Sequence, residues 1–437
     1  ADVVLLVGEN RVVVQAGLAK MVENPNIGIN ALISVAGLTG KQITAGHIGY
    51  TLAPRLNAAG RVSHATRAVE LLVTTNAEKA LDIADELQAT NVERQELERH
   101  IHEMARQDVI NQGHKADHII VVGGEGWHPG VIGIVASRLV EEFYKPTMVL
   151  SIHDGVGKGS CRSIEGFNVY EALKFCEDLL LQFGGHAAAA GFSIDAAHID
   201  ELRERLDGYC RKQLTTEDYV PIVNIDTTLP VNDIDVEIID NIAALEPYGM
   251  GNSTPVFAVT SAEVQDVILM GQLKKHCKVI LKTAQGSIDA IAWNRPDLFK
   301  QIFAGDMVKV AFSLQKNEWQ GYVSPQLMIQ DIELLGEQHI VLTTEGLREM
   351  YLVVKQIARG GRLSQYQMEQ EVLRRHPKNQ NHASAMMALQ VFKELGIILE
   401  DENDDGLTMY RWNQVQGKLD LVTSITFLTY SKQEVSP

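Results

Sequence analysis

Residues 118–152 read HIIVVGGEGWHPGVIGIVASRLVEEFYKPTMVLSI. An apolar run at 118–123 and another at 147–152 flank a helical pattern at 131–144, which predicts a βαβ unit. Pro129 suits the first turn of that helix, where its missing amide costs nothing. The glycines of the loop do not form G-x-G-x-x-G, so a dinucleotide fingerprint is rejected. A helix N-terminus beside the imidazole of His128 is competent to hold a phosphate oxygen, and the alternative is a histidine that caps a tight turn.

The segment that follows continues the same domain. GKGSCRS at 157–163 ends a further strand, and Asn168 is expected to cap a helix. The inner face of that helix is expected to carry Val169, Leu173, Cys176, Leu179 and Leu180. After Gly184-Gly185-His186 and four alanines comes a strand at 191–194, and a helix containing Leu202, Leu206 and Tyr209 closes the domain near residue 217.

Before this unit, residues 77–112 contain neither Gly nor Pro and carry apolar residues at helical spacing, which predicts one long connector helix. About 35 residues of helix would span ~50 Å, which suits a strut between domains.

Residues 1–76 are too few for a domain. They include an apolar run at 2–7 that reads as a strand and a Gly-containing turn, PRLNAAGR, at 54–61. We expect them to be the last third of an α/β domain cut at Ala1.

Beyond Val220 the pattern changes to short β-rich segments. About five or six strands within 218–336, with little helix between them, predict a small closed barrel of OB type. Residues 337–437 read as three helices, an acidic stretch and a strand, which predicts a winged-helix-like module. The fold class is therefore α/β plus β-barrel, with expected domains at 1–76, 77–112, 113–217, 218–336 and 337–437.

Composition limits the function. Of 437 residues, 39 are Lys or Arg and 56 are Asp or Glu, which gives a net charge of −17. An anionic ligand must therefore be held by a local cationic site. The four cysteines, Cys161, Cys176, Cys210 and Cys277, contain no C-x-x-C pair, so neither a thiolate zinc site nor a disulfide framework is expected, and a reducing cytoplasm fits. No apolar run of roughly 18 residues or secretory leader is present, so no membrane partner is expected.

Three short motifs carry candidate anion-binding residues. Ser160 and Arg162 leave one strand on the same face, where a hydroxyl and a guanidinium can close on one phosphate. Gly184 and Gly185 permit close backbone approach beside His186, although a buried structural histidine is the alternative. Arg55 and Arg61 gather cations on one turn, with the amide of Asn57 between them, unless they are a helix cap with surface arginines.

The barrel segment combines cations with aromatic residues, as single-stranded nucleic acid requires. The candidates are Lys274, Lys275, Lys278, Trp319 and Tyr322. His276, Lys282 and Trp293 lie in the same region, and the alternative is that the tryptophans are core residues. In the last module, the wing carries Glu400, Asp401, Glu402, Asp404 and Asp405, which would repel a phosphate backbone, so partner docking is the expected role there.

Taken together, these strings resemble the RecJ family, single-strand-specific 5′-to-3′ DNA exonucleases of the DHH phosphoesterase superfamily. The matching strings are ADVV, PRLNAAGR, EGWHPGVIGIVASRL, GKGSCRSIEGFNVYEAL, FGGHAAAAGFS and EPYGMGNSTPVF, which lie within residues 1–257. The resemblance implies a DHH-associated domain at 113–217 and an OB-fold after it. The last hundred residues match only a subset of the family that has an extra domain.

The resemblance also implies a mechanism. Two divalent ions, Mn²⁺ or Mg²⁺, activate a water for in-line attack on the first phosphodiester, and 5′ mononucleotides are released in DNA repair and recombination. Asp2 falls on one metal-ligand position, but the sequence contains no Asp-His-His triplet, so most of the catalytic domain is expected to be missing and this chain alone to be inactive. Ser160 and Arg162, helped by Arg55, would grip the 5′ phosphate, while His128 and His186 would line the cleft near the scissile group.

Two other interpretations remain open. Relatives that hydrolyse short oligoribonucleotides or cyclic dinucleotides also show a Gly-Gly-His string, but they lack the barrel and the long connector. A non-catalytic scaffold could bind single strands or replication proteins without hydrolysis. The helical C-terminal module is the expected docking surface for single-strand-binding protein or a helicase.

Overall fold

The computed structural model describes residues 3–62, 64–111, 117–335, 342–358, 361–376, 382–402, 408–415 and 419–431. The chain forms two compact units. The first comprises Ala1–Ile222 with Leu245–Thr254, and the second comprises Val223–Ala244 with Pro255–Pro437. No helix among the described residues is long and apolar enough to cross a membrane.

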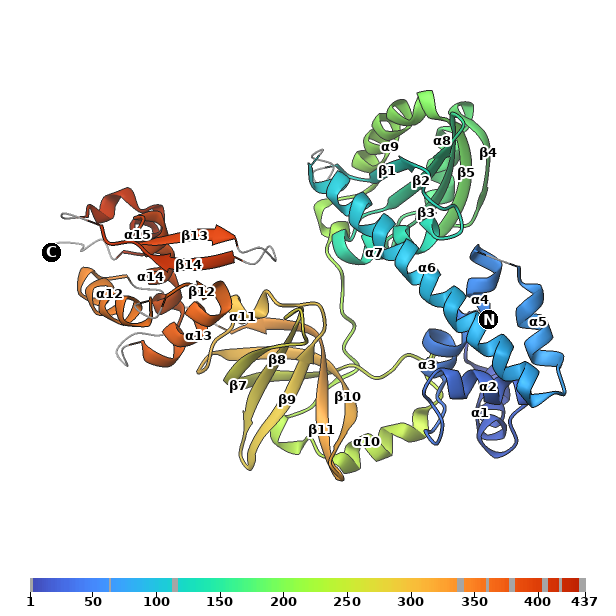
Figure 1. Cartoon of the computed structure of the whole chain (residues 1–437), viewed down its shortest axis with the longest axis horizontal. Helices are drawn as coiled ribbons and strands as arrows, with labels where there is room; N and C mark the ends of the chain where they lie inside the picture. Colours follow the sequence, from blue (N-terminus) through green and yellow to red (C-terminus); the bar gives the residue numbers. More distant parts are fainter. Residues whose placement is uncertain are drawn as a thin grey trace. The chain divides into compact units, whose positions relative to one another are not determined.

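The first unit begins with helices (Figure 1). They are α1 (Gly8–Glu23), α2 (Ile27–Val35), α3 (Ala45–His47), the π-helical turn η1 (Ile48–Leu52), α4 (Ala53–Val62) and α5 (Thr66–Val73). The predicted strand over residues 2–7 is wrong, because residues 3–6 have no regular structure and the described residues before Ile120 offer no second strand. The predicted turn at PRLNAAGR is helix α4, since its alanines favour helix and Ala58 and Ala59 are buried.

The connector helix is confirmed as α6 (Ala77–Asn111). Its first half packs Ile83 and Leu87 into the N-terminal helical core, and its second half packs Ile101 and Val109 against the α/β lobe. Between these apolar halves lies a buried polar segment. Arg94 donates hydrogen bonds to Glu98 and Asn91, and Arg138 of α7 (Ile132–Phe143) lies 2.5 Å from Glu98, so the buried carboxylate is paired with cations.

The α/β lobe contains a five-stranded sheet of order β1-β2-β3-β5-β4. The strands are β1 (Ile120–Glu125), β2 (Thr147–His153), β3 (Val156–Arg162), β4 (Leu180–Gly185) and β5 (Ala189–Asp195). β1 and β2 are parallel, with α7 as their crossover, so the predicted βαβ unit is confirmed. Pro129 lies in the turn before α7 rather than in its first helical turn.

Of the two helices predicted after β3, the first is shorter than expected and the second is confirmed. Asn168 caps α8 (Val169–Phe175) by accepting hydrogen bonds from the amides of Tyr170 and Glu171, as predicted. That helix stops at Phe175, however, and Leu180 begins edge strand β4, which pairs with β5. The final helix, α9 (Ile199–Gln213), buries Leu202 and Leu206 as predicted.

The two faces of this sheet are covered unequally. One face, with Val121, Met148, Leu150, Phe192 and Ile194, packs against α8 and α9. On the other face, α7 and α6 pack against Ile120, Val122 and Val149 of β1 and β2 (Figure 1). Helix α7 also reaches β3, and beyond it side chains of β3, β5 and β4 on that second face border a hollow.

The second unit contains the predicted barrel. Its strands are β6 (Thr227–Thr228), β7 (Phe257–Met270), β8 (His276–Thr283), β9 (Gly286–Ala292), β10 (Met307–Trp319) and β11 (Tyr322–Leu334). Their order is β10-β11-β9-β8-β7-β6, and an additional β10–β7 pairing closes the ring. Helices α10 (Val236–Ile242) and α11 (Leu298–Gln301) flank it, and Val279, Leu281, Val310 and Phe312 lie in its core.

The C-terminal part of this unit is a helical module with a small sheet. Its helices are α12 (Thr344–Ala358), α13 (Gln365–Arg375), α14 (His382–Glu394) and α15 (Ile425–Tyr430), and its sheet has the order β12-β14-β13. The strands are β12 (Leu363–Ser364), β13 (Ile398–Glu402) and β14 (Thr408–Trp412). The third helix was expected over residues 382–399, but it stops at Glu394, because Gly396 turns the chain with positive φ and Ile398 starts β13. Asp404 and Asp405 lie outside the described residues.

Candidate nucleic-acid interface

Strand β3 places Ser160 and Arg162 on the open face of the sheet. Along β3 exposure alternates, so that Gly159 and Cys161 are buried while Lys158, Ser160 and Arg162 face the other way. The Nη1 group of Arg162 lies 3.3 Å from the Ser160 hydroxyl oxygen, and it also donates a hydrogen bond to the carbonyl of Cys161 at 2.7 Å. The predicted proximity of these two side chains is confirmed.

The first turn of α7 packs against this pair. The Nε group of Arg162 donates to the Ser137 hydroxyl at 3.1 Å, so one helical side chain orients the guanidinium. Gly133 makes the approach possible, because a Cβ at that position would lie 3.0 Å from the Ser160 Oγ and 3.1 Å from the Arg162 Nη2. Helix α7 therefore presents its N-terminal end to the same small region as a hydroxyl and a guanidinium.

The charge of Arg162 is not neutralised by the part of the chain that the structure describes. Burial lowers the pKa of Arg162, and the nearby positive charge of Arg61 lowers it further, yet an arginine stays protonated. No carboxylate lies within ion-pair distance of either guanidinium among the described residues. Many other arginines of this acidic chain are paired, such as Arg67 with Glu86 and Arg205 with Asp178. Two guanidinium groups in one region, without a described carboxylate partner, make this region a candidate site for an anion.

Arg61 reaches this region from the N-terminal helices. It lies in the last turn of α4 and donates a hydrogen bond to the carbonyl of Gly130 at 3.1 Å. The contact needs glycine, since a Cβ on Gly130 would lie 2.2 Å from the Arg61 carbonyl oxygen. His128 shapes the same loop by accepting a hydrogen bond from the Gly130 amide on Nδ1 at 3.1 Å. His128 thus makes the turn-capping contact and keeps Nε2 for other partners.

Gly130→Ala is expected to separate α4 from the loop before α7. The methyl group would overlap a backbone carbonyl that cannot rotate away, so Arg61 would move out of its position near Arg162. We expect affinity for a 5′-phosphorylated single strand to fall about three- to tenfold, the loss of one charged contact of roughly 1 kcal/mol. Fluorescence anisotropy measures this effect, with Gly208→Ala as the control because a methyl group added there would meet no atom within 4 Å. An unchanged affinity would remove Arg61 from the site.

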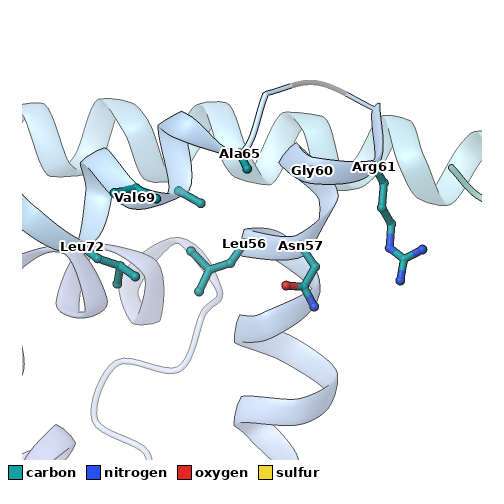
Figure 2. A pocket seen from close by; sticks show the side chains of 8 residues that line it. Leu56, Asn57, Gly60, Arg61, Ala65, Val69 and Leu72 are labelled. Carbon is teal, nitrogen blue, oxygen red and sulfur yellow. The ribbon is translucent and has the colours of Figure 1, made fainter. Parts of the chain in front are cut away.

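Arg55 and Asn57 lie beside this region on α4. Arg55 donates to the carbonyl of Thr51, its Nε is buried without a hydrogen-bond partner, and burial lowers its pKa. Asn57 and Arg61 line a hollow of about 470 Å³ with the apolar residues Leu56, Val69 and Leu72. Figure 2 shows the side chains of Asn57 and Arg61 projecting from α4. Arg61 lies near enough to lower the pKa of Arg162 by its positive charge, and the printed hydrogen bond of Arg55 stays within its own helical segment.

The Gly-Gly-His string forms the turn between β4 and β5. Gly185 has φ +147° and a Cβ there would lie 2.5 Å from the Ala189 carbonyl oxygen, so only glycine fits. His186 is exposed, which makes the buried alternative wrong, and its Nδ1 accepts from the Ala188 amide at 3.3 Å. The carbonyl of Ala188 accepts from the Ser163 amide at 3.0 Å, so this turn lies at the end of β3 that carries Arg162.

A hollow of about 520 Å³ extends from Ser160 across β5 and β4. Ser160, Gly191 and Gly184 are cross-strand neighbours in one row, and Lys158, Ser193 and Gln182 form the next row. The structure thus adds Lys158, Gln182 and Ser193 to the predicted residues, together with Ser137. The alternation of β3 already contained the signal for Lys158, which stands two residues before Ser160.

The barrel exposes its aromatic candidates. Trp319 and Tyr322 are 70% and 81% exposed in the β10–β11 turn, and Trp293 is 55% exposed, so the core alternative is wrong for both tryptophans. Lys274 and Lys275 lie in the β7–β8 turn. The register of β8, β9 and β11 places this turn and the aromatic turn at opposite ends of the strands. Lys278 lies 3.0 Å from Asp289, which offsets its charge.

The described residues contain no group of three or more His, Cys, Asp or Glu side chains that could hold a metal ion. The predicted metal ligand, Asp2, lies outside the described residues. The residues that the structure describes therefore do not fit a two-metal centre, and no catalytic step is assigned to them.

Comparison with known proteins identifies the domains that carry these residues. The DHHA1 domain family matches residues 116–212, and the RecJ OB domain family matches residues 225–331. The single-stranded-DNA-specific exonuclease RecJ of Bacillus subtilis is 38% identical over 333 residues, which cover 76% of this chain and 42% of that protein. The RecJ of Escherichia coli is 31% identical over 343 residues, with 76% and 59% covered.

Solved structures give the same result. The crystal structure of Thermus thermophilus RecJ in complex with Mg²⁺ superimposes with a TM-score of 0.66 at 31% identity, covering 80% of this chain and 55% of that one. The corresponding Mn²⁺ complex also gives 0.66, at 32% identity, with 80% and 52% covered. The chain spans about half the length of the relatives that it matches. It belongs to the RecJ family.

Proposed function

We propose that this chain is part of a single-strand-specific 5′-to-3′ DNA exonuclease and that Ser160 and Arg162 hold the 5′ phosphate. The observation that carries the proposal is the guanidinium pair of Arg162 and Arg61, which has no carboxylate partner among the described residues of an acidic chain. A terminal phosphate supplies the missing negative charge with several acceptor oxygens. The 5′-to-3′ direction of digestion follows from this site, because a site enclosed by β3 and α7 admits the end of a strand more readily than an internal phosphate.

The neighbouring residues have proposed roles around this clamp. His128 and His186 would border the scissile phosphodiester, and Gly184 and Gly185 would allow the backbone to approach the strand. Arg55, Asn57 and Arg61 would contact the first nucleotides from the side of α4. Two ions, Mn²⁺ or Mg²⁺, would serve the whole protein, with Asp2 as one ligand. Paired metals stabilise both the attacking and the leaving oxygen of an in-line displacement.

We propose that the barrel holds the strand downstream of the cleft. Exposed Trp319 and Tyr322 offer stacking surfaces worth about 1–3 kcal/mol per base, while Lys274 and Lys275 would contact the backbone at the other end of the strands. Eight residues of β8 span about 27 Å, so a strand that met both turns would follow the barrel lengthwise. The alternative of a barrel without DNA contact would leave these aromatic groups exposed without a role.

The C-terminal module is proposed to be winged-helix-like and to dock single-strand-binding protein or a helicase. Its wing is acidic, and Asp401 pairs with Arg411 while Glu400 pairs with Lys393, so it presents little free positive charge to DNA.

We place the protein in the cytoplasm. All four cysteines are buried free thiols, and burial raises the pKa of each, which keeps them unreactive in a reducing compartment.

Binding of labelled oligonucleotides to the full chain tests the proposal. We expect a 5′-phosphorylated single strand to bind more tightly than the same strand with a 5′-hydroxyl, and both to bind more tightly than blunt duplex. Equal binding of the two ends would contradict the phosphate clamp. A preference for di- and trinucleotides over longer strands would instead favour the oligoribonuclease branch.

The purified chain alone is expected to hydrolyse single strands negligibly, even with Mn²⁺. A two-metal centre needs several carboxylates, and the sequence contains no Asp-His-His triplet. Release of mononucleotides from a 5′-labelled strand is the measurement. Mn²⁺-dependent digestion that stops on chelation would overturn this expectation while leaving the clamp intact. In the whole protein, digestion is expected, and its absence would favour the non-catalytic scaffold.

A further inference from the structure

The hollow beside Ser160 is larger than one phosphate requires, and its lining has a distinct chemistry. Its side walls are formed by Lys158, Ser160, Gln182 and Ser193 of the sheet and by Pro129 and Ile132 before and in α7. None of its lining residues is acidic, although the chain carries 56 acidic residues. The Gln182 amide lies 3.4 Å from the Ser193 hydroxyl, and both residues stand in the same cross-strand row as Lys158, so hydrogen-bonding groups line the hollow beside the ammonium.

Two glycines keep the hollow open. Gly191 and Gly184 stand next to Ser160 in the same cross-strand row. A Cβ on Gly184 would meet nothing within 4 Å, and one on Gly191 would meet only the Gly159 carbonyl at 3.7 Å. Side chains at these positions would therefore project into free space rather than clash. The sheet tolerates residues there that would fill the hollow, yet it has none.

Aromatic rings do not face the hollow. Phe183 and Phe192 border it, but their rings pack in the core on the opposite face of the sheet, and Phe183 contacts Tyr170 of α8 there. A pocket for a nucleobase would normally offer a stacking surface. A lining of one ammonium, two hydroxyls and an amide, without a ring or a carboxylate, is suited to an oxyanion.

Lys158 is placed to extend the phosphate site. It stands two residues from Ser160 on the same strand face, about 6.8 Å along β3. It is exposed, and among the described residues it makes no ion pair. Its flexible stem lets the ammonium reach a charge beyond the one held by Ser160 and Arg162. A single 5′ phosphate leaves this cation without a partner.

We propose that the hollow holds the outer phosphates of a strand whose 5′ end carries a di- or triphosphate. The inference rests on the proposed function: the first phosphate is held by Ser160 and Arg162, and Lys158 contacts the second or third. Substrates of this class are strand ends that keep the triphosphate of their first nucleotide. Gln182 and Ser193 would donate to the same oxygens.

The experiment compares three ends on one single-stranded sequence: 5′-hydroxyl, 5′-monophosphate and 5′-triphosphate, each bound to the full chain at constant salt. The triphosphate is expected to bind about tenfold more tightly than the monophosphate, the effect of one partly exposed charge-assisted contact. Lys158→Ala should abolish that advantage and leave the affinity for the monophosphate within about twofold. Lys158→Glu should make the chain bind the monophosphate end more tightly than the triphosphate end.

The matched control is Lys174→Ala, which removes an exposed lysine of α8 from the same lobe. It should change none of the three affinities by more than about twofold, because screening weakens distant charges. Equal affinity of the wild-type chain for triphosphate and monophosphate would overturn the inference, as would equal losses for all ends in Lys158→Ala. A different result would contradict the proposed clamp of Ser160 and Arg162, namely equal affinity for the monophosphate and hydroxyl ends.

Discussion

Arg162→Ala is expected to lower the affinity of the full chain for a 5′-phosphorylated single strand about 10- to 100-fold, since hydrogen bonds to charged groups contribute ~1.5–3 kcal/mol. The same substitution should change the affinity for a 5′-hydroxyl strand by less than about twofold, because the barrel contacts remain. Two features raise the effect above that of a surface arginine. The guanidinium is largely enclosed by β3 and α7, and the positive charge of Arg61 beside it is unpaired among the described residues.

Two further variants make this result specific. Arg211→Ala removes an exposed arginine of α9 that pairs with Asp207, and it should leave both affinities unchanged. Arg162→Lys keeps the charge but loses the planar fork that contacts Ser137, Ser160 and a phosphate together, so it should recover only part of the lost affinity. Anisotropy titrations measure all four proteins. Equal losses for phosphorylated and hydroxyl strands in Arg162→Ala would show that the arginine contributes general attraction and not end recognition.

The spacing of apolar residues predicted the helices and strands in which buried positions recur at regular intervals. The βαβ unit, the connector helix and the barrel strands from Phe257 onward follow from alternating or helical apolar patterns. The errors arose where an apolar run fits two periods. Leu179 and Leu180 continue the helical spacing of α8, yet Leu180 is paired as an edge strand. The run at residues 2–7 has strand composition, but a strand forms only where a neighbour pairs with it.

The candidate site divides in the same way. The proximity of Ser160 and Arg162 could be predicted, because a spacing of two on a strand fixes the face. The contact of Arg61 with Gly130 joins residues 69 positions apart and depends on how α4 packs beside the loop before α7, which no local pattern encodes. Lys278 was predicted as a cation for nucleic acid. The pairing of β8 with β9 brings its ammonium to 3.0 Å from Asp289, which offsets its charge.

The strand that carries Ser160 is held from behind by Phe192, and this contact gives the largest expected change in stability. Phe192 is 4% exposed, and its ring covers Gly159 on the adjacent strand, where a Cβ would lie 2.1 Å from the ring. Phe192→Ala is expected to lower the free energy of unfolding of this lobe by about 3–5 kcal/mol, the usual range for a buried phenylalanine. Gly159→Ala should cost about 1–3 kcal/mol because the added methyl overlaps the ring.

The pair provides a test that neither variant gives alone. In the double variant the methyl of residue 159 enters the space that the ring has left, so the two losses should not add, and the total should fall short of their sum by about 1 kcal/mol or more. Gly191→Ala is the matched control, since its methyl would meet only a carbonyl at 3.7 Å and should change stability by less than about 1 kcal/mol. Urea unfolding monitored by circular dichroism measures each value. Additive losses would mean that Phe192 and Gly159 act independently, and Ser160 would then owe its position to α7 rather than to the ring behind its strand.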